Sequence, residues 1–175
     1  CEISVIIARS VTGTTATYCP VENRHVHHIL DTTIAPARVT EVVIAKAEAI
    51  AKHIADQLQI IGLLAVEMFV TNADTILVNE LAPRPHNSGH WTIDACQTSQ
   101  FEQLVRAVTG LPLGSTERRA DAIMKNLIGS DVEGWPALAK DPNVFLHLYG
   151  KTEVRPGRKM GHITRLFKEG TLPDE

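Results

Sequence analysis

The apolar positions in the first half of the chain predict one long helix among short strands. A helical stripe runs from about residue 41 to residue 60, between a cap at Thr40 and a break at Gly62, and consists of Val43, Ala47, Ile50, Ile54 and Leu58. The β-type runs are Ile3–Ala8, Thr14–Tyr18, Leu63–Val70 and Thr75–Glu80. Turn residues at 10–13 and 71–74 separate the members of each pair, so we expect two hairpins. Residues 19–38 show no periodicity.

The second half begins with another helix and ends in strands. Ser99 and Glu102 form a capping box that opens an amphipathic helix over 100–109, and Gly110 closes it. A segment with proline and glycine at 111–114 and charged residues at 117–119 mark a domain boundary near 115–120. Beyond it, the sequence predicts strands at 122–128, 144–149 and 161–167, with a short helix near 134–139. The fold class is therefore α+β, with one domain over 1–114 and a small, β-rich domain over 115–175.

Composition narrows the possible partners. With 175 residues, the chain can bury one core with a small appendage. A net charge of −3 gives no reason to expect nucleic acid or an anionic membrane as partner, and no apolar run reaches the roughly 18 residues of a membrane span. We interpret Cys1, Cys19 and Cys96 as free thiols of a cytoplasmic protein. The chain opens on a strand without an initiator methionine, so we expect it to be a piece of a longer protein.

Two glutamates on neighbouring strands suggest a metal site. Glu67 lies in an apolar run, where a lone carboxylate is costly to bury. If the strands pair through the 71–74 turn without a bulge, Glu67 and Glu80 lie on one face, where their charges repel. Mg²⁺ prefers one or two carboxylates plus substrate phosphates, so we expect it here. For either glutamate alone, a structural salt bridge would be the simpler interpretation.

The loop after Glu80 is rich in side chains that bind ligands. Pro83, Pro85 and Gly89 give it a defined path. Its polar members are Asn79, Glu80, Arg84, His86, Asn87, Ser88 and His90. A strand that ends in this run predicts an anion and metal site.

Histidines and a basic loop supply further candidates. His25, His27 and His28 have no cysteine or further histidine at zinc-finger spacing, so we favour a nucleotide contact over zinc. The basic loop contains Lys151, Arg155, Arg158 and Lys159 around Pro156 and two glycines, a composition suited to a phosphate. A solvated turn is the alternative interpretation of this loop.

Four motifs together resemble one enzyme family: NELAPRPHNSGHW at 79–91, the helix start at 99–102, GLPL at 110–113 and YGK…RPGRKMGH at 149–162. They are similar to those of the N5-carboxyaminoimidazole ribonucleotide synthases, ATP-grasp ligases of purine biosynthesis, from Glu2 to about Leu166. The resemblance implies that residues 1–114 are the C-terminal lobe of an ATP-grasp module, an antiparallel sheet with helices. The first half of the module and the domain before it are not in this chain, so we expect the isolated piece to be inactive.

The resemblance also implies a reaction and its residues. ATP and bicarbonate would form a carboxyphosphate-type intermediate that carboxylates the amine of 5-aminoimidazole ribonucleotide, in a cytoplasmic homodimer. Residues matching Glu67 and Glu80 hold Mg²⁺, and those that contact ATP match Glu2, His25, Asn79 and Glu80. The catalytic, bicarbonate end matches Arg84, His86 and Asn87. Lys151 and Arg158 match positions at the end of the site that binds the ribonucleotide phosphate. The composition of the basic loop adds Arg155 and Lys159 as candidates for the same phosphate.

Two other interpretations stay open at this point. A different ATP-grasp ligase, such as a formate-dependent glycinamide ribonucleotide transformylase, shares the fold, although the RPGRKMGH loop argues against it. A non-catalytic fragment that binds nucleotide or metal weakly, or only packs against a partner, is the other. Mg²⁺-dependent ATP turnover stimulated by aminoimidazole ribonucleotide separates the first interpretation from both.

Overall fold

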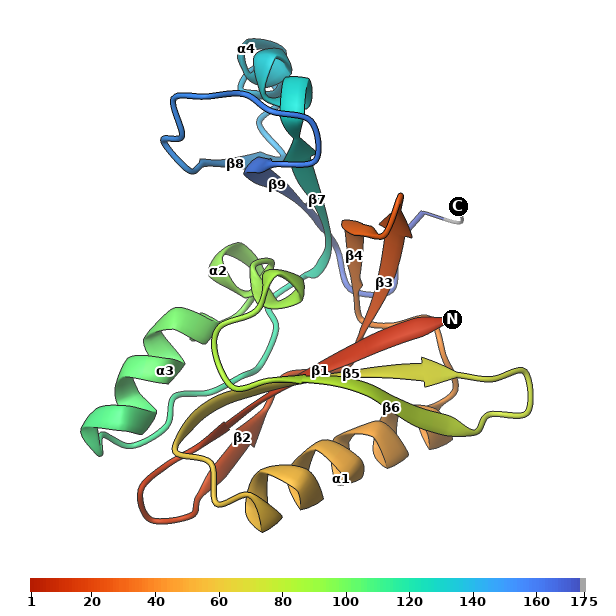
Figure 1. The fold of residues 1–175 in the computed structure, drawn as a ribbon, viewed down its shortest axis with the longest axis vertical. Helices are drawn as coiled ribbons and strands as arrows, with labels where there is room; N and C mark the ends of the chain where they lie inside the picture. Colours follow the sequence, from red (N-terminus) through yellow and green to blue (C-terminus); the bar gives the residue numbers. More distant parts are fainter. Residues whose placement is uncertain (174–175) are drawn as a thin grey trace.

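The computed structural model describes residues 1–173, which form an α+β fold (Figure 1). The strands are β1 (Glu2–Arg9), β2 (Thr15–Thr17), β3 (Val21–Val26), β4 (Ile29–Ala35), β5 (Gly62–Val70), β6 (Ile76–Ala82), β7 (Asp121–Ile128), β8 (Val144–Leu148) and β9 (Lys159–Phe167). The α-helices are α1 (Glu41–Gln57), α2 (Thr92–Ala95), α3 (Gln100–Thr109) and α4 (Trp135–Leu138), and the 3₁₀ helices are η1 (Asn87–Gly89) and η2 (Gly129–Gly134).

All of the described strands belong to one antiparallel sheet. Its order is β6-β5-β1-β3-β4-β7-β9-β8, and β2 pairs with β1 beside this path. The predicted hairpins β1–β2 and β5–β6 are confirmed. Strand β4 pairs with β7, so the β-rich C-terminal part continues the sheet of the first part and rises above it in Figure 1. The predicted domain boundary near residue 115 precedes β7 and stays a prediction.

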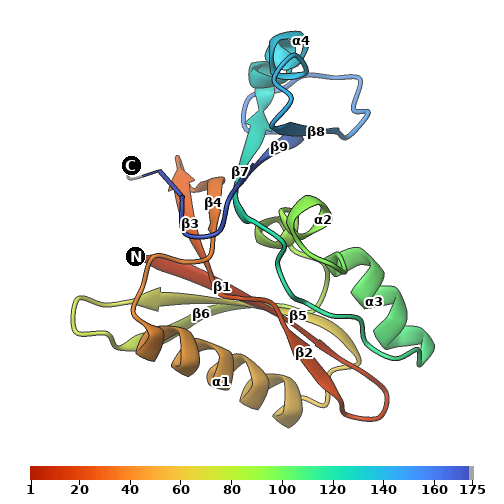
Figure 2. The same ribbon diagram turned by 180° about the vertical axis from the view of Figure 1, so that it is seen from behind.

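The two faces of β1 and β5 bury two separate cores. Helix α1 covers one face with Val43, Ala47, Ala51 and Ala55. The other face carries the cluster of side chains around the fully buried Trp91. Helix α3 packs against this cluster and therefore lies on the opposite side of the sheet from α1 (Figure 2). Since both faces are covered, β5 appears in the sequence as an almost unbroken apolar run rather than an alternating one.

The ends of the helices follow the predicted caps, with one difference. Thr40 accepts a hydrogen bond from the Val43 amide, and Ser99 accepts one from the Glu102 amide. Gly110 ends α3 with a φ of 75°, a left-handed conformation that glycine adopts without strain. The prediction that the first helix reaches residue 60 is wrong, because Gln59 has a φ of 49° and the helix ends at Gln57.

The hairpin β3–β4 lies in the region where the sequence showed no periodicity. His27 and His28, with φ of 50° and 63°, are the two residues of its turn. Two positive φ values are the mark of a type I′ turn, in which asparagine and glycine are usual. Asn23 and Thr33 face inward from these strands, at 5% and 0% exposure, so polar residues occupy positions where an apolar pattern was sought.

The C-terminal strands and helix agree with the prediction. Strands β7, β8 and β9 correspond to the runs expected at 122–128, 144–149 and 161–167, and η2 and α4 occupy the region of the expected short helix. Asp121, at the start of β7, is buried and accepts a hydrogen bond from Arg118 Nε at 2.8 Å. None of the described helices has the length and apolar composition needed to cross a membrane.

Candidate functional site

The candidate site lies where one face of the sheet changes from apolar to polar. On β1 this face carries Ile6 in the core, followed by Ser4 and Glu2. On β5 the same face carries Ala65 and then Glu67, which lies directly opposite Ser4. The polar side chains are therefore held by strands whose other ends are fixed in the core, and the fold positions them rigidly.

Glu67 and Glu80 are direct partners across β5 and β6, as the metal hypothesis requires. The condition under which they were predicted to meet, pairing without a bulge, is wrong. The register shifts between Glu67 and Met68, so Asn79 is an extra residue between Val78 and Glu80. If the register of the pairs next to the turn, such as Met68 with Val78, continued without the bulge, Glu67 would pair with Asn79. Glu80 would then lie on the opposite face of the sheet. The bulge therefore brings the two carboxylates together.

The carboxylate of Glu67 lies in an unfavourable electrostatic environment. Burial, together with the charges of Glu2 and Glu80, raises its pKa above the ordinary value, and Lys159 and Arg84 only partly counteract this. Its side chain is 12% exposed, so solvent screens these charges little. A divalent cation between Glu67 and Glu80 would relieve the repulsion, and oxygen ligands suit Mg²⁺. The residues present fit that ion.

The positions predicted to contact ATP lie on this polar face or at its edge. His25 Nδ1 lies 3.2 Å from Glu2 Oε2, which joins β3 to β1 at the site. Asn79 and Glu80 are exposed on β6, the edge strand of the sheet. Glu2 and His25 thus lie on the adjacent strands β1 and β3, and β5 with Glu67 separates β1 from Asn79 and Glu80 on β6.

The loop after β6 brings His86 to the carboxylates. His86 Nε2 lies 3.4 Å from Glu67 Oε1, and its side chain is 15% exposed. Burial, followed by the charges of Arg84, Lys159 and His25, lowers the pKa of His86 to about 4, so the ring is neutral near pH 7. Arg84 is exposed, and its Nη1 donates to the carbonyl oxygen of Pro85 at 3.1 Å.

Gln100 holds this loop through its backbone. Its Oε1 accepts from the His86 amide at 3.0 Å, and its Nε2 donates to the His86 carbonyl oxygen at 2.8 Å. The same amide nitrogen lies 2.9 Å from His90 Nδ1. Gly89 is required beside it, because a Cβ there would lie 2.6 Å from Gln100 Oε1. The reason for glycine at this position is therefore packing and not the backbone freedom expected from the sequence, since the φ of Gly89 is not positive.

Asn87 joins the loop to the C-terminal part of the chain. Its Nδ2 donates to Asn126 Oδ1 at 2.9 Å, and Asn126 Nδ2 donates back to Asn87 Oδ1 at 2.6 Å. Asn126 is fully buried on β7 and also donates to the carbonyl oxygen of Leu30. This reciprocal amide pair fixes the position of the loop relative to β7.

The cations of the basic loop differ in their surroundings. Lys159 is half-buried, and desolvation lowers its pKa below the ordinary value although the charge of Glu67 opposes this. Lys151 Nζ donates to the carbonyl oxygen of Lys159. Arg155 pairs with the Glu153 carboxylate at 2.7 Å, and Arg158 Nη1 donates to the Glu153 carbonyl oxygen at 3.1 Å. The Arg158 amide donates to the Arg155 carbonyl oxygen at 3.1 Å, so a tight turn lies between the two arginines.

A second polar cluster, of Asp94, His147 and His162, lies between α2, β8 and β9. His147 Nε2 lies 2.9 Å from Asp94 Oδ2, and His162 is 1% exposed with an unpaired Nε2. The His147 and His162 rings stack with their centroids 4.5 Å apart at 16°. Lone pairs in nearly parallel ring planes do not converge on one ion, so this arrangement suits a packed interface better than a metal.

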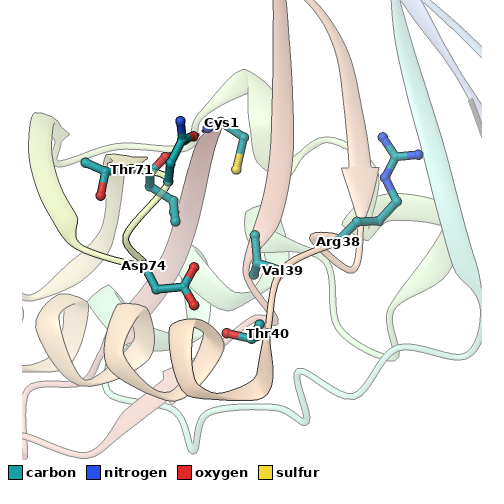
Figure 3. A pocket seen from close by; sticks show the side chains of 8 residues that line it. Cys1, Arg38, Val39, Thr40, Thr71 and Asp74 are labelled. Carbon is teal, nitrogen blue, oxygen red and sulfur yellow. Dashed lines mark hydrogen bonds between the residues drawn. The ribbon is translucent and has the colours of Figure 1, made fainter.

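A surface hollow of about 410 Å³ lies away from the candidate site (Figure 3). It is at the start of α1 and the turn between β5 and β6, and its lining includes Cys1, Thr40, Thr71 and Asp74. None of the predicted site residues lines it.

The sequence of the chain matches a known class of protein. The sequence pattern of the ATP-grasp domain matches residues 1–101, and that of the phosphoribosylaminoimidazole carboxylase C-terminal domain matches residues 122–171. The chain therefore belongs to the ATP-grasp family. The α+β fold and the ATP-grasp lobe predicted from the sequence are confirmed.

Within the family, the chain is similar to N5-carboxyaminoimidazole ribonucleotide synthases. It is 52% identical to the one of Bacillus subtilis over 166 residues, which cover 93% of this chain and 43% of that protein. A solved ADP complex of an N5-carboxyaminoimidazole ribonucleotide synthetase superposes with a TM-score of 0.93 at 50% identity, covering 95% of this chain and 44% of that one. The Aspergillus clavatus enzyme, solved with ADP and 5-aminoimidazole ribonucleotide, gives a TM-score of 0.88 at 36% identity, over 95% of this chain and 46% of that one. The chain thus spans less than half of the length of these relatives.

Several residues of the site were missed from the sequence. Ser4, Asn23, Gln100 and Asn126 are buried polar side chains that hold the loop or the face of the sheet. Ser4 and Asn126 lie in runs that predicted ordinary strands, and Asn23 lies in the segment without periodicity. The sequence signal that could have found them is an isolated polar residue inside an apolar strand. This signal was used only for Glu67.

Proposed function

We propose that this chain is the C-terminal part of an ATP-dependent ligase that converts 5-aminoimidazole ribonucleotide, bicarbonate and ATP to N5-carboxyaminoimidazole ribonucleotide, ADP and phosphate. The observation that carries the proposal is the pairing of Glu67 with Glu80, with His86 Nε2 3.4 Å from the Glu67 carboxylate. Two carboxylates that can hold a divalent cation, with a neutral imidazole beside them, suit a reaction between anionic substrates. The similarity to synthases of this reaction supports the same assignment.

At the ATP end of the proposed site, we assign Glu67 and Glu80 to Mg²⁺ and Glu2, His25, Asn79 and Glu80 to the nucleotide. The bound ion would neutralise charge on the phosphoryl oxygens. The protein positions these groups on paired strands, so little reorganisation is needed when the substrate binds.

At the bicarbonate end, we assign Arg84, His86 and Asn87. The neutral His86 ring can donate a hydrogen bond to a carboxylate-type oxygen, and the Arg84 cation offsets the charge of that oxygen. The pairing of Asn87 with Asn126 makes it a residue that holds the loop in place. Lys151, Arg155, Arg158 and Lys159 are assigned to the ribonucleotide phosphate, because four cations in one short segment suit a dianion.

The parent protein would act as a cytoplasmic homodimer, and the isolated chain would be inactive because half of the ATP site is missing. Cys1, Cys19 and Cys96 are all free, in keeping with a reducing compartment.

The test is the Glu80→Gln variant of the full-length protein, assayed for ADP release with and without aminoimidazole ribonucleotide and bicarbonate. The substitution keeps the shape but removes the charge, so Mg²⁺-dependent turnover should fall by orders of magnitude. Near-normal activity in this variant would refute the metal assignment. Turnover of the wild type with formate and glycinamide ribonucleotide in place of the proposed substrates would show a different ligase. Absence of turnover with either set would indicate a non-catalytic protein.

A further inference from the structure

A row of buried polar side chains runs across the face of the sheet that carries Glu67 and ends at His86. Its members come from β4, β3, β1 and η1, and they are 0–5% exposed: Thr33, Asn23, Ser4 and Ser88. Thr33 Oγ1 donates to Asn23 Oδ1 at 3.0 Å, and Asn23 Nδ2 donates to Ser4 Oγ at 3.0 Å. Ser4 Oγ donates to Ser88 Oγ at 2.8 Å, and the Ser88 hydroxyl lies 2.9 Å from His86 Nδ1.

The direction of the last bond is fixed by the backbone. The Ser88 amide donates to His86 Nδ1 at 3.4 Å, and a backbone N–H is always a donor. Nδ1 therefore carries a lone pair, and the single proton of the neutral ring is on Nε2. The hydroxyl chain agrees with this direction. Because Ser4 receives a hydrogen bond from Asn23, its own proton is available to Ser88, and the Ser88 proton is available to Nδ1.

We propose that Ser88, supported by Ser4 and Asn23, is a positioning residue that holds His86 in the neutral Nε2–H tautomer, so that His86 donates to an anionic oxygen and does not accept a proton from substrate. The atom that faces the site is Nε2, 3.4 Å from Glu67 Oε1. With its proton there, it cannot act as a general base. It can donate to the carboxylate-type oxygens of bicarbonate or its phosphorylated form, an identity that rests on the proposed function.

The buried polar row lies where it can hold the ring of His86 in one orientation. Thr33, Asn23 and Ser4 lie on the same face of the sheet as Glu67, and Ser88 joins them from η1. Fully satisfied polar networks of this kind fix one arrangement of their end group. Ser88 is also inside η1, where His86 itself accepts the capping hydrogen bond from the Ser88 amide. The orientation of the ring is thus set twice by the same residue.

The first test measures the tautomer directly in the chain with ¹⁵N-labelled histidine. Long-range ¹⁵N–¹H correlations at neutral pH distinguish a bare nitrogen from a protonated one, and the His86 signals are assigned by their loss in His86→Gln. We expect a bare Nδ1 and a protonated Nε2. A protonated Nδ1, or protons on both nitrogens, would overturn the proposal whatever reaction the protein performs.

The second test uses variants of the row. Ser88→Ala removes one hydrogen bond to Nδ1 and should shift the tautomer ratio about fivefold toward Nδ1–H, the equivalent of one net hydrogen bond. Ser88→Thr keeps the hydroxyl and should restore the ratio. Ser4→Ala leaves the Ser88 hydroxyl in place and should give a smaller shift than Ser88→Ala. An unchanged ratio in Ser88→Ala, in a chain that still unfolds cooperatively, would refute the role of Ser88.

The third test links the tautomer to turnover in the full-length protein. We expect Ser88→Ala to lower kcat for aminoimidazole ribonucleotide carboxylation with little change in the KM for ATP, and Ser88→Thr to recover kcat. Equal losses in Ser88→Ala and Ser88→Thr would show a merely steric role. If the full-length wild type does not carboxylate aminoimidazole ribonucleotide, the proposed function fails, whereas the spectroscopic result still decides the tautomer.

Discussion

Glu67→Gln is expected to stabilise the metal-free chain, although Glu67 is proposed as a metal ligand. Burial and the charges of Glu2 and Glu80 raise the pKa of Glu67 above its ordinary value of 4.5. The folded state therefore holds the proton more tightly than the unfolded state, and the ionised carboxylate destabilises the fold at neutral pH. Glutamine removes the charge, and its oxygen can still accept from His86 Nε2, which lies 3.4 Å from the Glu67 carboxylate.

The size of the effect follows from the register. Like charges directly opposite each other across an antiparallel pair destabilise by up to about 1 kcal/mol, and Glu67 faces Glu80 in this way. We therefore expect the free energy of unfolding to rise by about 1 kcal/mol, or the Tm to rise by about 2–4 °C in a chain of this length.

The same substitution at Glu22 is a matched control with the opposite sign. Arg38 and then Arg24 lower the pKa of Glu22 through side-chain hydrogen bonds, although burial opposes them. Arg38 binds both carboxylate oxygens, at 2.9 and 2.8 Å. Glu22→Gln should lower the free energy of unfolding by about 1–2 kcal/mol, because charge-assisted bonds are lost from a partly exposed partner.

Urea unfolding of both variants and the wild type in a chelator, between pH 4 and pH 8, tests the reasoning. The gain in Glu67→Gln should vanish where wild-type Glu67 is protonated and should grow as pH rises through the raised pKa. Adding Mg²⁺ should stabilise the wild type by mass action and leave Glu67→Gln nearly unchanged. A loss of stability in Glu67→Gln at pH 8 without metal would refute the electrostatic argument. A gain that does not depend on pH would refute it too.

Three further predictions concern the clamp, the basic loop and the isolated chain. Gln100→Ala should lower the free energy of unfolding by about 2–4 kcal/mol by urea unfolding, because it leaves the buried amide and carbonyl of His86 without their partner; a change below 1 kcal/mol would contradict this. Arg158→Ala in the full-length protein should raise the KM for aminoimidazole ribonucleotide much more than the KM for ATP, and equal rises would assign the loop to structure or to ATP. The purified 175-residue chain should show no carboxylation of aminoimidazole ribonucleotide; product formed at rates near those of the parent would overturn this.

Much of the fold followed from local signals in the sequence. The caps at Thr40 and Ser99 and the left-handed Gly110 are where they were predicted, because each depends on hydrogen bonds within a few residues. The β3–β4 hairpin did not follow, since its turn uses His27 and His28 in place of the usual asparagine and glycine. Strand pairs that depend on distant residues, such as β4 with β7, had no local signal at all.

The sequence predicted the charged and ionisable residues of the candidate site but not the uncharged, buried residues that support them. Glu67 and His86 stood out because a charged or ionisable group among apolar residues or in a rigid loop requires an explanation. Gln100 and Asn126 carry no charge. The side chain of Gln100 bonds to His86, 14 residues away in sequence, and that of Asn126 bonds to Asn87, 39 residues away. Their role depends on long-range contacts, which pattern and spacing do not encode.

The pairing of Glu67 with Glu80 shows how a correct conclusion can rest on a wrong premise. The side chains of paired strands alternate between faces, so one residue inserted on one side reverses every position beyond it. Asn79 is that inserted residue, and the 71–74 turn sets a register in which Glu80 would otherwise lie opposite Val66 and face α1. The charges themselves were the better guide. A carboxylate at Glu80 on the α1 face would be buried against an apolar core, whereas the bulge places it at an exposed edge beside Glu67. The charge of Glu80 therefore predicts the polar face of β6 correctly, whereas the register set by the 71–74 turn predicts the wrong face.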